Sequence, residues 1–477
     1  MSNLSELLPT GGGQNAVDFV ASGTLSSGQT VALKTDGTVE AVGITAISQS
    51  TTSPASFYTT TYALASLYNP DTQKVIVAYN QGDTNSYGAI QVGTVSASSI
   101  SFASPVIFKS SNVSFLSMAY DTANQKIVIA YRNANASGNG EAVVGDGVTF
   151  GSAVRFEPSY SDSSFISAAY DTNAGKIVIA SRENDSGSLL GRIVVGTVSG
   201  TSISFGTSVA ANGGSTAFLS ICYDENAQKI FMGTSSPNGI GKVWTVSGTS
   251  ISAGADTVLS SSTARGLNVA YNPTLQKVVA AFGDASNSNY GSAVVGTISG
   301  TSVSFGTKTV FFTGYSDKIS CAYDSNAEKM AISFYTNSPA TRVVQGTMSG
   351  TSISFTTSLL IESVFGSETS SVYDPTAQKV VVFYIDGTNS YNGQYVIYQQ
   401  AYSATNVADF IGITAEAISD TATGAVNVYG GINEAQTGLT IASDYYVQND
   451  GSISTTSSAV KIGQAISATT INMMDLT

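Results

Sequence analysis

The chain contains no histidine and two cysteines, Cys222 and Cys321. Histidine is the commonest general base and the commonest metal ligand, so its absence excludes histidine-based catalytic triads and most zinc sites. Two thiols are too few for a disulfide framework or a four-cysteine metal cluster. We therefore expect no enzyme activity, no cofactor and no metal site.

Charge and long apolar runs are also scarce. Charged residues make up 11% of the 477 residues, and the formal net charge is −13. An acidic chain lacks the positive surface that binds nucleic acid or anionic lipid. No apolar run approaches the ~18 residues of a membrane-spanning helix, and residues 1–6 lack the basic and apolar regions of a secretion signal. We expect a protein made in a cytoplasm, with no nucleic-acid partner and no membrane insertion.

Glycine (47 residues), tyrosine (24) and phenylalanine (20) are abundant, and they occur within an internal repeat. Each copy has an apolar segment ending in Tyr, then Asp or Asn, a short polar turn, a Lys six residues after the Tyr, and a second apolar segment. The copies centre on Tyr68, Tyr120, Tyr170, Tyr223, Tyr271, Tyr323 and Tyr373, and their lysines are Lys74, Lys126, Lys176, Lys229, Lys277, Lys329 and Lys379.

Each repeat of about 50 residues predicts four antiparallel strands. In the second copy, residues 115–120, 126–131 and 141–144 form the first three strands, and the hairpin at 194–205 of the third copy is the clearest example of the fourth. Four strands repeated seven times are typical of a seven-bladed, all-β propeller. An open β-solenoid is the alternative, although its coils are usually shorter.

The repeated residues have structural explanations. An Asp or Asn after the Tyr accepts a backbone N–H in an Asx-turn, which explains why the two residue types interchange. The lysines pair locally, and the tyrosines pack at the edge of the core with their hydroxyls bonded. Calcium at these turns is the alternative, but one carboxylate per turn does not supply the six or more oxygens that calcium takes.

The seventh repeat lacks its fourth strand, because no counterpart of the Ser-Ile-Ser-Phe segment follows residues 395–398. Residues 44–53 precede the first repeat at the corresponding distance. A propeller must close its ring or expose an edge, so we expect residues 44–53 to pair with 395–401. Cys222 and Cys321 precede their tyrosines by one and two residues, in blades too far apart for a disulfide. They are therefore expected to be free thiols on opposite faces of their sheets.

The two ends of the chain resemble each other. Residues 31–39 and 445–453 each contain an Asp-Gly pair typical of a hairpin turn. This predicts a small all-β domain built from residues 1–43 and 403–477, with the propeller, residues 44–402, inserted in it. The apolar strands of this domain exceed what a small isolated domain needs, which indicates contacts with other proteins or with its own copies.

Three stretches carry a resemblance to a known family: the opening MSNLSELLPTGGGQN, the VGTVSGTSISFG hairpins, and the tail GINEAQTGLTIASDYYV from residue 431. They resemble the propeller-bearing structural proteins of marine tailed bacteriophages, cyanophages among them, which are described as tail-fibre-like or virion-decorating. The resemblance implies a virion component and carries no catalytic residues. The shortened hairpin at 144–150, and Trp244 where glycine is usual, depart from the pattern.

Four functions follow from these patterns. The first is a non-enzymatic virion structural protein that displays the propeller, with the domain built from both termini bound to other virion proteins or to its own copies. The second is a receptor-binding module for host-surface glycans. Its candidate residues lie in loops between second and third strands, where the alternative is simple turn chemistry: Asn85, Tyr87, Asn287, Tyr290, Asn389 and Tyr391.

The third function is a glycan-cleaving enzyme, which needs two carboxylates flanking one bond. Here the carboxylates are spread along the chain, about one to each turn. The fourth is an extracellular filament or cell-surface subunit unrelated to phage.

Overall fold

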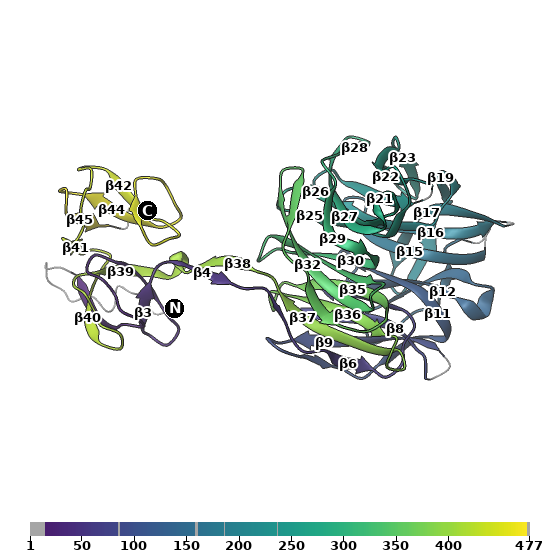
Figure 1. Ribbon diagram of the computed structural model, residues 1–477, viewed down its shortest axis with the longest axis horizontal. Coiled ribbons are helices and arrows are strands. Elements are labelled where there is room, and N and C mark those ends of the chain that lie inside the picture. The colour runs from purple at the N-terminus through teal and green to yellow at the C-terminus, as the bar shows by residue number, and fades with distance from the viewer. Residues whose placement is uncertain (1–14, 84–85, 158–160, 186, 236, 475–477) are drawn as a thin grey trace. The chain divides into compact units, whose positions relative to one another are not determined.

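The computed structural model describes residues 15–83, 86–157, 161–185, 187–235 and 237–474 (Figure 1). The chain divides into two compact units, Ser48–Ala401 and a unit that combines Met1–Ile47 with Tyr402–Thr477. We call them the propeller and the split domain. The boundaries predicted from sequence, after residues 43 and 402, differ from these by four residues and one.

The propeller is all-β and has seven blades of antiparallel strands. Blade one contains β7 (Leu64–Asn69), β8 (Lys74–Gln81), β9 (Tyr87–Val95), β10 (Ile100–Phe102) and the start of β11 (Val106–Asp121). Blade two contains the rest of β11 with β12 (Lys126–Asn133), β13 (Asn139–Gly145) and β14 (Val154–Arg155). Blade three contains β15 (Ser161–Asp171), β16 (Lys176–Asp185), β17 (Ser188–Ser199), β18 (Ser202–Phe205) and β19 (Val209–Ser215).

The remaining blades repeat this order. Blade four contains β20 (Phe218–Asp224), β21 (Lys229–Ser235), β22 (Gly239–Ser247), β23 (Ser250–Ala253) and β24 (Thr257–Ser260). Blade five contains β25 (Ala264–Asn272), β26 (Lys277–Asp284), β27 (Tyr290–Ser299), β28 (Ser302–Phe305) and β29 (Thr309–Tyr315). Blade six contains β30 (Asp317–Asp324), β31 (Lys329–Thr336), β32 (Ala340–Ser349), β33 (Ser352–Phe355) and β34 (Leu359–Glu362). Blade seven contains β35 (Gly366–Asp374), β36 (Lys379–Asp386), β37 (Asn392–Gln399), β5 (Ser50–Thr51) and β6 (Ala55–Tyr58).

The outermost strand differs from the single fourth strand that the sequence predicted. In most blades it is broken into two short segments that pair with the two ends of the third strand, as β18 and β19 do with β17. In blade seven these segments are β5 and β6, which pair with Gln399–Tyr398 and Tyr395–Gly393 of β37. The closing segment is therefore 50–58 rather than 44–53, because residues of β4 (Ile44–Ile47) pair with β38 (Tyr402–Thr405) outside the blade.

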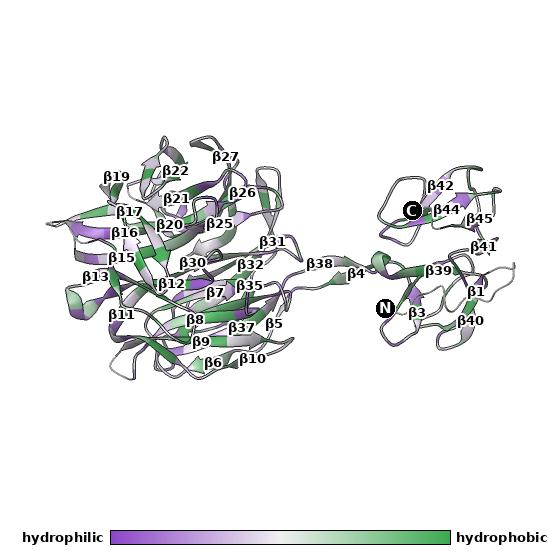
Figure 2. Ribbon diagram, turned by 180° about the vertical axis from the view of Figure 1, so that it is seen from behind, coloured by the Kyte–Doolittle hydropathy of each residue, from purple (hydrophilic) through white to green (hydrophobic). Residues whose placement is uncertain are grey.

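The second strand of each blade is apolar on both faces because neighbouring blades cover both. In β8, for example, every residue after Lys74 is buried, and Figure 2 shows hydrophobic residues along this strand. The apolar side chains gather into seven clusters, one between each pair of neighbouring blades. One of them joins Val77 of blade one to Val381 of blade seven, which closes the ring.

The repeated Tyr and Asx residues connect successive blades at one face of the propeller. Each Asp or Asn after the Tyr accepts backbone N–H groups of its own turn, as Asp374 does from Thr376 (2.9 Å) and Ala377 (3.0 Å). The Tyr hydroxyl bonds to the turn of the preceding blade. The Tyr68 hydroxyl reaches the Thr376 hydroxyl at 2.8 Å, across the junction between blades one and seven. We call this side the Asx face.

The first strands contact one another in cyclic order, and in a β-propeller these strands surround a central channel. At six of the seven junctions, a Ser or Asn side chain of one first strand accepts the backbone N–H of the next. The Ser220 hydroxyl accepts from Val269 N (3.2 Å), and the Ser370 hydroxyl accepts from Ser66 N (2.9 Å), which again joins blades seven and one. At the seventh junction the equivalent residue of blade one is Ala65.

The thiols behave as the sequence predicted. Both cysteines are free. Cys222 packs in the cluster between blades four and five, and Cys321 packs in the cluster between blades five and six. The two side chains therefore lie on opposite faces of their own sheets, both toward blade five.

The split domain contains two five-stranded sheets. The first is formed by β1 (Ala16–Val20), β40 (Thr423–Val428), β39 (Phe410–Thr414), β2 (Thr30–Leu33) and β3 (Val39–Ala41). The second is formed by β41 (Ile432–Asn433), β45 (Ile471–Met473), β44 (Lys461–Ala465), β42 (Asp444–Val447) and β43 (Ile453–Ser454). Three short 3-10 helices complete the described secondary structure: η2 (Ala134–Ala136), η3 (Ala285–Asn287) and η4 (Val407–Asp409).

The two Asp-Gly hairpins form as expected, with Gly37 and Gly451 at φ +83° and +81°. The apolar strands of the split domain, however, are not surplus. Ile413, Ile462 and Ile471 are fully buried between the two sheets, and Val426 packs in a second cluster on the other face of the first sheet. The domain's own two cores therefore account for these buried residues, which the sequence suggested were reserved for partners, whereas Ile466 stays 50% exposed.

Candidate binding site

A cavity of about 230 Å³ lies at the end of the channel where the first strands begin. All seven blades contribute to its lining. Because the second strand of each blade ends on this side and the third begins there, the loops that join them surround the cavity. We call this side the mouth face; it is opposite the Asx face.

One position of the repeat supplies much of the lining. Counted back from each repeat Tyr, the fifth residue faces the cavity, and we call it the mouth position. From blade one to blade seven the mouth positions are Ala63, Phe115, Phe165, Phe218, Gly266, Lys318 and Glu368. The next residue along the chain is Leu or Ile in six blades and Thr369 in the seventh. The mouth position therefore varies where its neighbour is nearly constant.

The three phenylalanines form a continuous row. The ring centroids of Phe115 and Phe165 are 5.4 Å apart, and those of Phe165 and Phe218 are 4.9 Å apart in an edge-to-face arrangement. The guanidinium carbon of Arg182 lies 4.5 Å from the Phe165 ring centroid. One side of the cavity is therefore aromatic, and Phe115 stays 37% exposed.

The backbone at this position is unusual. Phe115, Phe165, Gly266 and Lys318 have φ values of +48°, +47°, +55° and +49°. In blades two, three, five and six, a shift in strand register accompanies the turn-out of the chain. Positive φ is rare for bulky residues and costs of order 1–3 kcal/mol. The bulges direct the side chains toward the channel axis rather than into the blades.

Charged residues form the other side. Lys318 Nζ lies 2.9 Å from Glu368 Oε1, and Asp317 Oδ2 lies 3.7 Å from Arg265 Nη1 and accepts from the Tyr315 hydroxyl at 2.8 Å. Solvent reaches 37% of the Glu368 side chain, but protein surrounds the carboxyl on most sides. Burial therefore raises the pKa of Glu368, and Lys318 opposes part of this rise.

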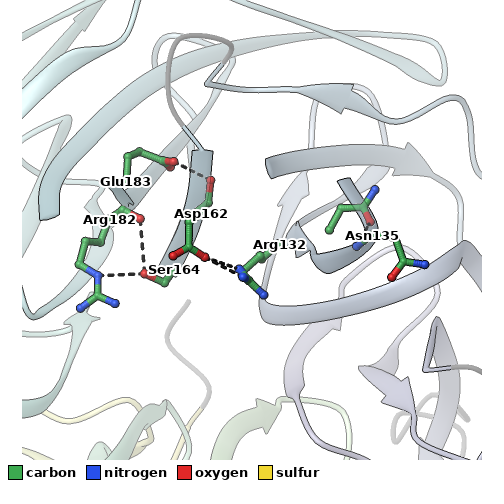
Figure 3. Close-up of polar contacts among 8 residues, drawn as sticks. Arg132, Asn135, Asp162, Ser164, Arg182 and Glu183 are labelled. Atoms are coloured by element: carbon green, nitrogen blue, oxygen red, sulfur yellow. Dashed lines mark hydrogen bonds and ion pairs between the residues drawn. The ribbon is translucent and has the colours of Figure 1, made fainter. Parts of the chain in front are cut away.

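Polar contacts between blades two and three and within blade three involve the residues next to Phe165 in the chain (Figure 3). Arg132 forms an ion pair with Asp162, its Nη2 2.6 Å from Oδ1, and Arg182 Nε donates to the Ser164 hydroxyl at 2.9 Å. Glu183, on the strand of Arg182, accepts hydrogen bonds from Ser163 (2.7 Å) and Ser181 (2.5 Å). Burial raises the pKa of Glu183 to about 7.

The rim residues predicted from sequence that the structure describes lie in three blades on this mouth face. Asn85 lies outside the described residues. Tyr87 and Tyr290 are half-buried first residues of β9 and β27, and Asn287, which ends η3, is exposed, as is Asn389. Among the described rim residues, Tyr391 contacts the cavity lining: its ring centroid lies 5.0 Å from that of Tyr62.

The rim loops form turns at residues 86, 288 and 390. Ser86, Ser288 and Ser390 in these loops have positive φ, which agrees with turn chemistry. Sequence reasoning missed Phe115, Phe165, Phe218, Lys318 and Glu368. The available signal was variation at one register of an otherwise regular repeat.

The fold is a seven-bladed β-propeller inserted in the chain of a split β domain. Neither a protein-family model nor a curated protein sequence matches the chain. Among solved structures it is similar to the BP39L lectin of Burkholderia pseudomallei, with a TM-score of 0.54 and 11% identity, over 72% of this chain and 97% of the lectin. It also matches the β-propeller domain of Cps50 (Swd1) from Myceliophteria thermophila, with a TM-score of 0.47 and 9% identity, over 72% and 98%. The likeness to the lectin concerns the fold alone.

No helix within the described ranges has the length and apolarity needed to cross a membrane.

Proposed function

We propose that this protein is a non-enzymatic binding protein of a tailed-phage virion, in which the split domain attaches to the particle and the propeller binds the host surface. The binding part rests on one observation, the cavity at the mouth face lined by all seven blades. The virion part rests on the sequence resemblance to propeller-bearing phage proteins.

The path of the chain supports this division of roles. The segments that enter and leave the propeller lie at the Asx face, because Gln400 Nε2 donates to the carbonyl of Lys329, directly after the Asx-turn of blade six. Gln345 also holds Ala401 through two hydrogen bonds, of 2.9 and 2.8 Å. The connections therefore leave the mouth face uninterrupted, as a surface that meets a receptor requires.

The split domain has features that suit attachment. Strand β1 is an edge strand with alternating exposed residues, and an edge strand can pair with another chain. Large apolar side chains also remain exposed on this domain, with Ile441 at 63% and Ile466 at 50%. These features favour other virion proteins or further copies of this chain as its partners.

The paired carboxylates at the mouth support a binding rather than a hydrolytic role. Glu368 contacts Lys318, and Asp317 contacts Arg265 and Tyr315. Hydrolysis of a glycosidic bond needs one carboxyl group as acid and a second as base or nucleophile, both directed at the substrate. The rim loops remain an alternative location for receptor binding.

Antibodies raised against residues 48–401 would test the virion assignment by immunogold labelling of particles purified from a lysate that contains the full chain. We expect labelled particles, and a chain lacking the split domain is expected to stay in the soluble fraction. Unlabelled particles, with the full chain free in the lysate, would contradict the assignment and favour a cell-surface or filament protein.

A further inference from the structure

The residue at the mouth position differs between blades, and the fold does not require a bulky side chain there. Blade five carries Gly266 there with the same left-handed backbone that Phe115 and Phe165 adopt. The fold therefore accepts a residue without a side chain at this position. Phe115 adopts a costly φ of +48° and still leaves 37% of its surface in solvent. Strained bulky residues that gather around one cavity are typical of ligand sites.

We propose that the channel mouth is a single pocket for one neutral sugar residue at the end of a glycan. The row Phe115, Phe165 and Phe218 contacts the apolar face of the sugar, and Lys318 and Glu368 bond its hydroxyls. This inference rests on the proposed binding function and adds to it the location, the ligand class and the number of sites.

The size of the cavity limits the ligand. Sites for drug-sized ligands have volumes of about 300–1,000 Å³, and this cavity of about 230 Å³ is smaller. Its inner part is lined by the buried side chains of Leu116, Ile166 and Leu219. A ligand therefore enters from the mouth face, and one ring at the end of a longer chain fits this volume.

The charges of the lining favour a neutral ligand. Each of the three charged lining residues contacts an opposite charge: Lys318 pairs with Glu368, and Asp317 pairs with Arg265. An anionic or cationic ligand would have to displace one of these partners. Hydroxyl groups can instead accept from Lys318 Nζ and donate to Glu368 without breaking a charge pair.

The two sides of the cavity match the two aspects of a sugar. A pyranose ring has a face of C–H groups, which aromatic rings bind, and an edge of hydroxyls, which polar side chains bind. Gly266 separates the aromatic side from Lys318, and a Cβ there would lie 2.5 Å from Asp317 Oδ1. The gap keeps Asp317 close to the channel axis and leaves the space between the two sides open.

The test uses the full chain and saturation-transfer NMR with single sugars. The neutral probes are glucose, galactose, mannose, rhamnose, N-acetylglucosamine and N-acetylgalactosamine, and the anionic probes are glucuronic acid and N-acetylneuraminic acid. We expect at least one neutral sugar to bind and the anionic sugars to bind more weakly. Calorimetry with the best probe should give one site per chain, whereas a site in every blade would give about seven.

Phe115→Gly is the diagnostic variant, because it removes one ring of the row and also the left-handed strain. We expect affinity to fall about tenfold, while the thermal midpoint stays close to that of the unmodified protein. Lys318→Gly, at the same φ, should also weaken binding. Asn287→Ala and Tyr290→Ala, at the rim of blade five, are the matched controls and should leave binding unchanged.

Several results would overturn the inference. The first is that no neutral sugar binds, and the second is that calorimetry gives several sites per chain. The third is that the rim variants lose binding while Phe115→Gly keeps it. In the last case the chain would still be a glycan-binding protein, so the proposed function would stand while the location failed. Virion labelling is a separate measurement, and its result does not depend on these sugar-binding experiments.

Discussion

Glu183 should make the stability of the propeller depend on pH in the direction opposite to that of a salt-bridged carboxylate. The residue has no exposed surface, and burial is the main cause that raises its pKa from 4.5 to about 7. The nearby Glu157 adds to the rise, whereas Arg155, Ser181 and Ser163 oppose it. The folded state therefore favours the protonated acid more than the unfolded state does.

The size of the effect follows from the two pKa values. Below about pH 4.5 the side chain is protonated in both states and costs nothing. As pH rises toward and past 7, the unfolded state has lost its proton and the folded state must ionise a buried group. Because one pKa unit corresponds to about 1.4 kcal/mol, the protein should lose about 2–3 kcal/mol of stability between pH 5 and pH 8 through this one group.

Urea unfolding at pH 5 and pH 8 would measure this loss. Trp244, the sole tryptophan, is 1% exposed in the cluster between blades three and four, next to the blade of Glu183, so its fluorescence reports on the relevant region. Glu183→Gln cannot ionise, and its stability should fall about 2–3 kcal/mol less than that of the unmodified protein over the same interval. Glu416→Gln, at an exposed position, controls for the loss of one charge. Parallel pH dependence of Glu183→Gln and the unmodified protein would refute the reasoning.

Two further substitutions test how the blades are joined. Gly206→Ala should destabilise the propeller by about 1–3 kcal/mol, because a Cβ at Gly206 would lie 2.1 Å from the carbonyl oxygen of Thr249 in the next blade. Gly214→Ala has no atom within 4 Å of its new Cβ, and equal losses in the two variants would contradict this account. Ser220→Ala should cost about 1–3 kcal/mol in urea unfolding, because it leaves the N–H of buried Val269 without its acceptor. Ser247→Ala, at an exposed position, should cost little. A Ser220 variant as stable as this control would mean that the hydrogen bonds between first strands contribute little to stability.

The glycines that follow the outer strands form a pattern that is visible in the sequence but is explained only by the structure. Glycine follows the outer strand at Gly151, Gly206, Gly254 and Gly306, and in each case the next blade has a Ser-Gly-Thr turn at this point. A Cβ on any of these glycines would lie within 2.1 Å of the carbonyl oxygen of that Thr. Where the next turn is the shortened one of blade two, Ala103 is tolerated. Where the next blade is closed by the N-terminal segment, Thr356 occupies the position and its hydroxyl contacts Gln49. Whether glycine is needed after an outer strand therefore depends on the turn of the next blade and not on the blade that carries the residue.

The sequence by itself determined whatever depends on interactions within a repeat. The Asx-turn after each Tyr joins residues two or three apart, and the apolar run after each Lys forms a strand buried on both faces. These are local relations, and seven copies of them predict seven antiparallel blades. The hairpins of the split domain follow for the same reason, because an Asp-Gly pair fixes its turn within a few residues.

Only the tertiary structure decided what depends on closing the ring. Closure brings Tyr68 to Thr376 and Ser66 to Ser370, which are about 300 residues apart in the chain, and it selected residues 50–58 rather than 44–53 as the last outer strand. It also gathers the seven mouth positions, one from each repeat, around one cavity. Their joint chemistry exists because the blades are arranged around an axis, and no spacing within a single repeat encodes the distance across that axis.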